Sequence, residues 1–135
     1  MDWTYIAAPF LAWLVAGALK FLINSLRAGK PAFAAVGLGG FPSNHSTIVS
    51  TVTTLIAWRE GFGPVFAVAL TLAFIVMLDA LDLRRRLGQQ AVALNLLAQR
   101  SGQDLALREK VGHTPLEVLG GIALGILLGG LLSQL

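Results

Sequence analysis

Two histidines are the most reactive side chains in this sequence, and each stands in a distinctive setting. His45 begins a Ser/Thr-rich stretch, and His113 lies four residues before Glu117. Residues four apart face each other across one helical turn, so Glu117 can hold one ring nitrogen of His113 and leave the other basic. That arrangement is typical of a nucleophile or a general base. A bystander histidine beside a helix-start glutamate would give the same spacing.

The residues around Ser43 could bind an anion. A Gly/Pro-rich stretch, 37–42, leads Ser43, Asn44 and Ser46 to the expected N-terminus of a helix. Unpaired backbone N–H groups and the helix dipole favour phosphate at such a place, and the hydroxyl groups would add donors. The plainer interpretation is that Ser43 or Asn44 only caps the helix. From these residue types alone we favour the cap, because such caps are common.

Four basic residues are candidates for binding the same anion. Lys20 and Arg27 are seven residues apart in one apolar stretch, hence on one helix face and about 10 Å apart. Arg84 and Arg85 follow Asp79, which is the natural ion-pair partner of either arginine. Taken singly, such cations could simply snorkel to the membrane surface. Together with two histidines, they provide what a metal-free phosphoryl-transfer site needs.

The composition indicates that membrane helices must position these residues. Of 135 residues, 13% are charged and 56% are hydrophobic, and the mean hydropathy is +0.74. A soluble domain has about 25% charged residues. Cysteine is absent, which excludes disulfides, thiolate metal sites and a cysteine nucleophile. Because few carboxylates are available for a metal, we expect no metal and no cofactor. We expect no nucleic-acid partner either.

The charge-free stretches predict an all-α polytopic membrane bundle that forms a single domain over 1–135. A helix needs roughly 20 apolar residues to cross a bilayer. Three stretches reach that length, namely 3–26, 62–81 and about 115–135. A fourth hydrophobic pass, 44–58, would be only about 22 Å long. We therefore expect its N-terminus at bilayer depth, reached by a loop over 37–42 that dips into the membrane.

Other segments bear on packing and orientation. We predict a short helix over 87–99, at the membrane surface or packed on the bundle, before a polar linker over 100–110. Gly121, Gly125 and Gly129 allow close helix packing, either within the chain, which we favour, or at a homodimer seam.

All Lys and Arg residues except Arg59 fall on one side of the predicted bundle. The positive-inside rule places that side, and the candidate site, in the cytoplasm of a bacterial inner (cell) membrane.

Three motifs, in order along the chain, resemble the divergent branch of the type 2 phosphatidic acid phosphatases, distant relatives of the vanadium-dependent haloperoxidases. They are Gly39-Gly40-Phe41-Pro42-Ser43-Asn44-His45-Ser46, then Asp79-Ala80 with Arg84-Arg85, Gly88, Gln90-Ala91 and Asn95, then Val111-Gly112-His113-Thr114-Pro115-Leu116-Glu117-Val118. The chain departs from the wider superfamily pattern at several places. Ala28 replaces a proline, Asn44 a glycine, Glu117 an aspartate and Leu107 an arginine, while Asp82 replaces the branch's usual glycine.

The resemblance implies a membrane phosphatase that acts on a lipid phosphate or lipid diphosphate without a metal or cofactor. It implies that His113 attacks phosphorus, that Glu117 orients His113, and that His45 protonates the leaving oxygen. The phosphate-binding residues would be Lys20, Arg27, Ser43, Asn44, Arg84 and Arg85, with structural support from Asp79, Gln90 and Asn95. Two alternatives stay open. One is a lipid-phosphate binding or transport protein without turnover, and the other is a structural protein whose charged residues anchor helices.

Overall fold

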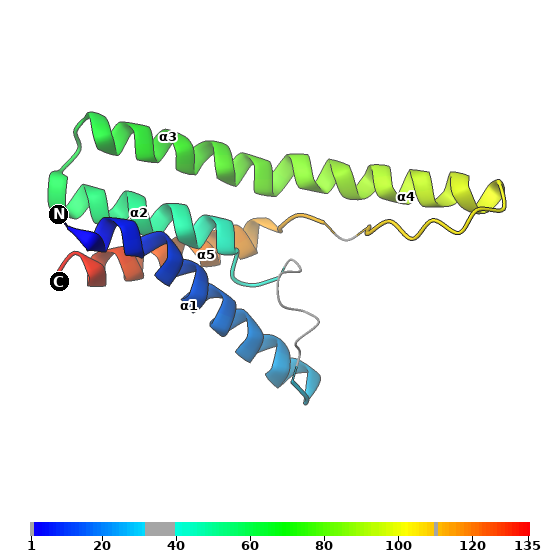
Figure 1. The fold of residues 1–135 in the computed structure, drawn as a ribbon, viewed down its shortest axis with the longest axis horizontal. Helices are drawn as coiled ribbons and strands as arrows, with labels where there is room; N and C mark the ends of the chain where they lie inside the picture. The colour runs from blue at the N-terminus through cyan, green and yellow to red at the C-terminus, as the bar shows by residue number, and fades with distance from the viewer. Residues whose placement is uncertain (1, 32–39, 110) are drawn as a thin grey trace.

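The computed structural model describes residues 2–31, 40–109 and 111–135 and is helical apart from its connections. Its elements, shown in Figure 1, are α1 (Trp3–Ala28), α2 (Asn44–Glu60), α3 (Pro64–Leu78), the π-helical turn η2 (Asp79–Leu83), α4 (Arg84–Arg100) and α5 (Pro115–Leu132). The predicted all-α membrane bundle is confirmed. Part of the predicted dipping loop, 37–39, lies outside the described residues.

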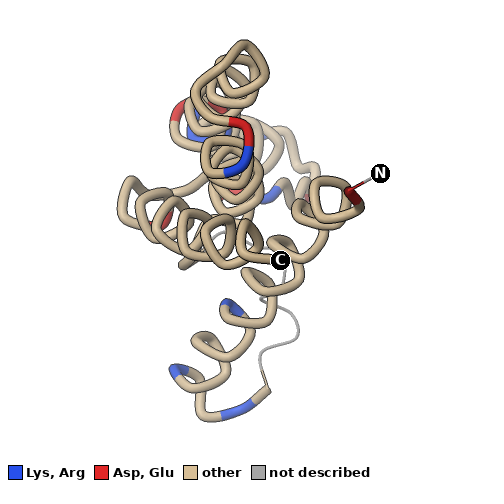
Figure 2. Tube along the Cα trace, turned by 90° about the vertical axis from the view of Figure 1, so that its left-hand side faces the viewer, with Lys and Arg blue, Asp and Glu red and all other residues tan. Residues whose placement is uncertain are grey.

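Three helical stretches of the described chain are long and apolar enough to cross a membrane. They are Trp3–Ala28, Pro64–Arg100 and Pro115–Leu132. Large apolar side chains such as Trp13, Phe74 and Leu127 are exposed on them, as expected for a surface that faces lipid. Figure 2 shows long lengths of these helices without a charged residue.

The Ser/Thr-rich α2 lies at the centre, where it contacts α1, α3 and α5. Its hydroxyl groups donate hydrogen bonds to carbonyls one turn back. Thr47 donates to the Ser43 carbonyl at 2.9 Å, and Thr51 donates to that of Thr47 at 2.7 Å. Because the helix satisfies these hydroxyl groups itself, a polar sequence can occupy the middle of an apolar bundle.

Small residues bring the neighbouring helices close to α2. Ala8, Ala12 and Ala16 are fully buried on α1. On α5, a Cβ atom added at Gly125 would lie 2.6 Å from the Ser50 Cβ, and Gly121 and Gly129 face α2 just as closely. The glycine row therefore packs α5 against α2 within the chain, which is the alternative that the sequence favoured.

The predicted helix over 87–99 exists, but it is not a separate helix. It belongs to α4, which continues α3 through η2 as one helical stretch of 37 residues. Figure 1 shows α4 projecting past the bundle, with the following segment running back along it. No glycine or proline separates Pro64 from Gly88, so nothing in the sequence ends the helix. We call α4 together with residues 101–109 the arm.

Both termini lie at the end of the bundle opposite the arm (Figure 1), which we call the termini end. Arg59 forms an ion pair with Asp2 and donates to the Leu132 carbonyl at 3.1 Å. The Tyr5 hydroxyl donates to the Glu60 carboxylate at 2.6 Å. This polar network ties together the ends of α1, α2 and α5.

Candidate functional site

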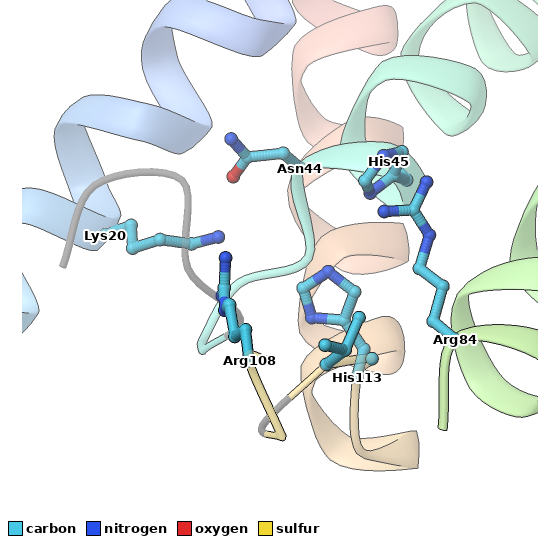
Figure 3. A pocket seen from close by; sticks show the side chains of 8 residues that line it. Lys20, Asn44, His45, Arg84, Arg108 and His113 are labelled. Carbon is cyan, nitrogen blue, oxygen red and sulfur yellow. The ribbon is translucent and has the colours of Figure 1, made fainter. Parts of the chain in front are cut away.

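At the other end of the bundle, the N-termini of α2 and α5, the junction of η2 with α4, and the middle of α1 surround a cavity of about 100 Å³ (Figure 3). A small anion fits into a cavity of this size. The cavity is lined by Lys20, Asn44, His45, Arg84, Arg108, Val111, Gly112 and His113. We call this the cavity end.

His113 is oriented by the start of α5. Its Nδ1 lies 3.0 Å from Oε2 of Glu117, and the His113 side chain is 7% exposed. Glu117 is held in turn by a capping box, in which it accepts from the Thr114 backbone N–H at 3.0 Å. A neutral imidazole that donates from Nδ1 to this carboxylate keeps its Nε2 lone pair for the cavity.

The charge state of His113 fits that role. Burial lowers the pKa of the His113 imidazole below its ordinary value of 6.5. The hydrogen bond to Glu117 opposes this effect, while the positive charge of nearby Lys20 adds to it. Burial outweighs the carboxylate, so the neutral form of the His113 imidazole is favoured.

His45 lies beside His113, although the two histidines are far apart in the sequence. Their ring centroids are 5.9 Å apart, with an angle of 64° between the ring planes. Among the described residues, Nδ1 of His45 and Oδ1 of the adjacent Asn44 are buried without a hydrogen-bond partner. Buried polar atoms normally have a hydrogen-bond partner, and both residues line the cavity.

Two cations enter the cavity from opposite walls, as Figure 3 shows. Lys20 lies one helical turn after Ala16, on the same buried face of α1, and is 3% exposed. It forms no ion pair with another described residue. Arg84 donates from Nε to Asp79 at 3.1 Å. In a π-helical turn, residues five apart come together, so η2 makes this pair and directs Arg84 toward His45.

Backbone hydrogen bonds join the elements that carry these side chains. The Ser43 N–H donates to the Glu117 carbonyl at 2.9 Å, and the His113 N–H donates to the Ala80 carbonyl at 3.0 Å. Gly112 adopts a φ of 102°, a conformation that favours glycine. The start of α5 is therefore tied both to the start of α2 and to η2.

Comparison with known proteins gives a family. A model described as "Divergent PAP2 family" matches residues 1–128. The chain belongs to this family. It is also similar to a protein named "Uncharacterized membrane protein YuiD" from Bacillus subtilis (strain 168), with 36% identity over 107 residues that cover 67% of this chain and 68% of the relative. No solved structure matches this divergent PAP2 chain.

Ser43, the serine of the first PAP2-like motif, is placed as a cap. It is fully buried, and its Oγ accepts from the Ser46 backbone N–H at 3.4 Å and from the Ser46 hydroxyl at 3.1 Å. It is not among the residues that line the cavity. The capping interpretation thus describes its contacts, whereas Asn44, one residue later, faces the cavity.

Three of the expected site residues of this divergent PAP2 protein lie away from the cavity. Arg27, Arg85 and Gln90 are exposed and do not line it. Figure 1 shows α1 diverging from the bundle toward its C-terminal end, which carries Arg27 outward although it shares a helix with Lys20. Asn95, expected as structural support, is buried on the arm.

Arg108 lines the cavity although it was not predicted as a site residue. The superfamily pattern has an arginine at the position of Leu107, six residues before His113. Arg108 is one position later, so allowing that pattern a one-residue shift would have found it. Within the described ranges, no cluster of three or more His, Cys, Asp or Glu residues could hold a metal ion.

Proposed function

We propose that this divergent PAP2 protein is a membrane phosphatase that hydrolyses a lipid phosphate or lipid diphosphate. The observation that carries the proposal is the pairing of two histidines in one cavity, His113 held by Glu117 and His45 with its ring centroid 5.9 Å away. Lys20 and Arg84 line the same cavity, where they would neutralise phosphoryl oxygens.

The proposed reaction has two displacements and uses neither metal nor cofactor. In the first, Nε2 of His113 attacks phosphorus, the bond from phosphorus to the lipid oxygen breaks, and His45 gives its proton to that oxygen. In the second, water attacks the phospho-histidine, His45 takes a proton from the water, and the bond from phosphorus to nitrogen breaks. Inorganic phosphate leaves, and both histidines regain their starting states.

The cavity's size and place support a lipid substrate. It has room for a phosphoryl group, and its lining is rich in cationic and polar side chains. It opens at helix ends of a bundle whose flanks expose apolar side chains, so a lipid tail can stay in the bilayer while its head group enters. Membrane lipid and the phosphorylated substrate are then the partners.

Measuring phosphate release tests the proposal. The full chain, purified in detergent, would be given a panel of lipid phosphates and diphosphates. We expect turnover in the wild type, and a loss of about a thousandfold or more in His113→Ala because the nucleophile is gone. Glu60→Gln at the termini end is the matched control and should keep its activity. Binding without turnover would favour a lipid-phosphate binding or transport protein. The absence of both binding and turnover would favour a structural role.

We also propose that the cavity faces the cytoplasm. All Lys and Arg residues except Arg59 fall on the side of the predicted bundle that carries the site. An excess of Lys and Arg marks the cytoplasmic side of a membrane protein. The chain has no cysteine, and Gln103 on the arm is exposed. A Gln103→Cys variant should therefore resist a membrane-impermeant thiol reagent in intact cells and react after lysis. Labelling in intact cells would place the arm, and the cavity with it, outside.

A further inference from the structure

Asn95 forms side-chain hydrogen bonds with one short stretch of the arm. Its Nδ2 donates to the Leu107 carbonyl at 2.8 Å and to Oε1 of Glu109 at 2.9 Å. Its Oδ1 accepts from the Leu107 N–H at 2.9 Å. The side chain is buried, with the residue 8% exposed. Three hydrogen bonds from one amide fix residues 107–109 against α4.

Gly88 lets the same stretch approach α4 closely. A Cβ atom at this position would lie 2.4 Å from the Glu109 carbonyl oxygen. Gly88 and Asn95 are seven residues apart on α4, hence on one face. The helix thus holds residues 107–109 at two points, although those residues belong to an exposed connection without helix or strand.

Arg108 lies between the two held residues and turns away from them. Successive side chains of an extended segment point to opposite faces. With Glu109 directed at Asn95, Arg108 points the other way, and Figure 3 shows it entering the cavity beside Lys20. The geometry of the arm therefore decides where this guanidinium lies.

We propose that Asn95 is a positioning residue that places Arg108 to bind the phosphoryl group together with Lys20. This inference rests on the anion site of the proposed function. An arginine on an unsupported exposed segment would lose backbone and side-chain freedom on binding an anion, and that loss weakens affinity. Because Asn95 orders residues 107–109 before the anion binds, this loss of conformational freedom no longer weakens the affinity. Asn95 itself touches no substrate.

A double-mutant cycle on phosphate affinity tests the inference. Inorganic phosphate would be titrated calorimetrically into the purified full chain as wild type, Arg108→Ala, Asn95→Ala and the double variant. We expect Arg108→Ala to weaken binding at least tenfold, because it removes a charged hydrogen bond, and Asn95→Ala to weaken it severalfold. The double variant should bind no more weakly than Arg108→Ala alone, since Asn95 acts through Arg108.

Several outcomes would overturn the inference. One is an unchanged phosphate affinity in Asn95→Ala or in Arg108→Ala. Another is a double variant whose loss of affinity is the product of the two single losses. The third is a wild type that does not bind phosphate. Gln99→Ala, an exposed position one turn beyond Asn95 on α4, is the control and should bind like wild type. If Asn95→Ala does not fold, Asn95→Asp replaces it, because the carboxylate keeps the bond from Leu107 N–H but cannot donate.

Turnover separates this inference from the proposed function. If a lipid phosphate is hydrolysed, Asn95→Ala should raise KM and leave kcat nearly unchanged, because it disturbs binding and neither histidine. A lowered kcat with an unchanged KM would indicate a general loss of structure and would contradict positioning. If wild type binds phosphate without turnover, the phosphatase proposal fails while the binding cycle still decides the role of Asn95.

Discussion

At the termini end, Asp2, Arg59 and Glu60 each have a partner within the chain. Arg59 pairs with Asp2, donates to the Leu132 carbonyl and lies over the Tyr5 ring, 5.5 Å from its centroid. At the cavity end, in the described part of the chain, the buried Lys20 has no ion pair, and His45 and Asn44 keep unsatisfied buried atoms.

The difference is what the proposed function predicts, because one end has its charges paired within the chain and the other leaves buried polar groups for a ligand. Buried polar groups without partners destabilise a fold, and a buried cation is especially costly in a membrane helix. The termini end avoids that cost by pairing its charges. The cavity end keeps it, and an anion there would accept hydrogen bonds from the Lys20 ammonium group and from a ring N–H of His45, whereas Asn44 Oδ1 needs a donor. Variants at the two ends should therefore affect different properties.

His45→Ala should give the largest effect at the cavity end beyond loss of the nucleophile. Removing a general acid should lower kcat on a lipid phosphate by about 10²–10⁴-fold. The loss should be much smaller with p-nitrophenyl phosphate, because its leaving group departs as a stable anion and needs no proton. Steady-state kinetics on both substrates measure this, and equal losses would contradict the assigned role.

Lys20→Met should separate binding from stability. The variant keeps the length and apolar stem of the side chain but removes its charge. Phosphate affinity should fall by about 10–100-fold with the loss of a charged hydrogen bond. The thermal unfolding midpoint should stay constant or rise, because an unpaired buried cation has been removed. A clear drop in that midpoint would mean that Lys20 is part of the fold's support.

Arg59→Met should have the opposite pattern. It leaves the Asp2 carboxylate and the Leu132 carbonyl without their partner, so the thermal unfolding midpoint should fall by about 2–8 °C. Phosphate affinity and kcat should match wild type, because Arg59 lies at the far end of α2 from the cavity. A loss of affinity at unchanged stability would remove the distinction between the two ends.

The sequence predicted what depends on local pattern. Charge-free stretches located the three spanning helices, and the four-residue spacing of His113 and Glu117 predicted their contact. It could not predict the tilt of α1, which separates Arg27 from Lys20, because tilt depends on packing between helices. Arg108 was missed because the superfamily pattern has its arginine at the position of Leu107, and the contact of Asn95 with Leu107 that lies beside this one-residue shift joins residues twelve apart.

Glu117→Gln should give the smallest effect, a displacement of the pH profile. The nucleophile must be neutral, so kcat/KM falls as the pH drops through the pKa of His113. Burial lowers that pKa below 6.5, and Glu117 partly offsets the lowering. The substituted amide would keep an acceptor for the Thr114 N–H but lose the negative charge that favours the protonated ring. The pKa of His113 should then fall further, and the acid limb of log(kcat/KM) should move to lower pH. An acid limb that moves to higher pH would contradict neutral His113 as the nucleophile.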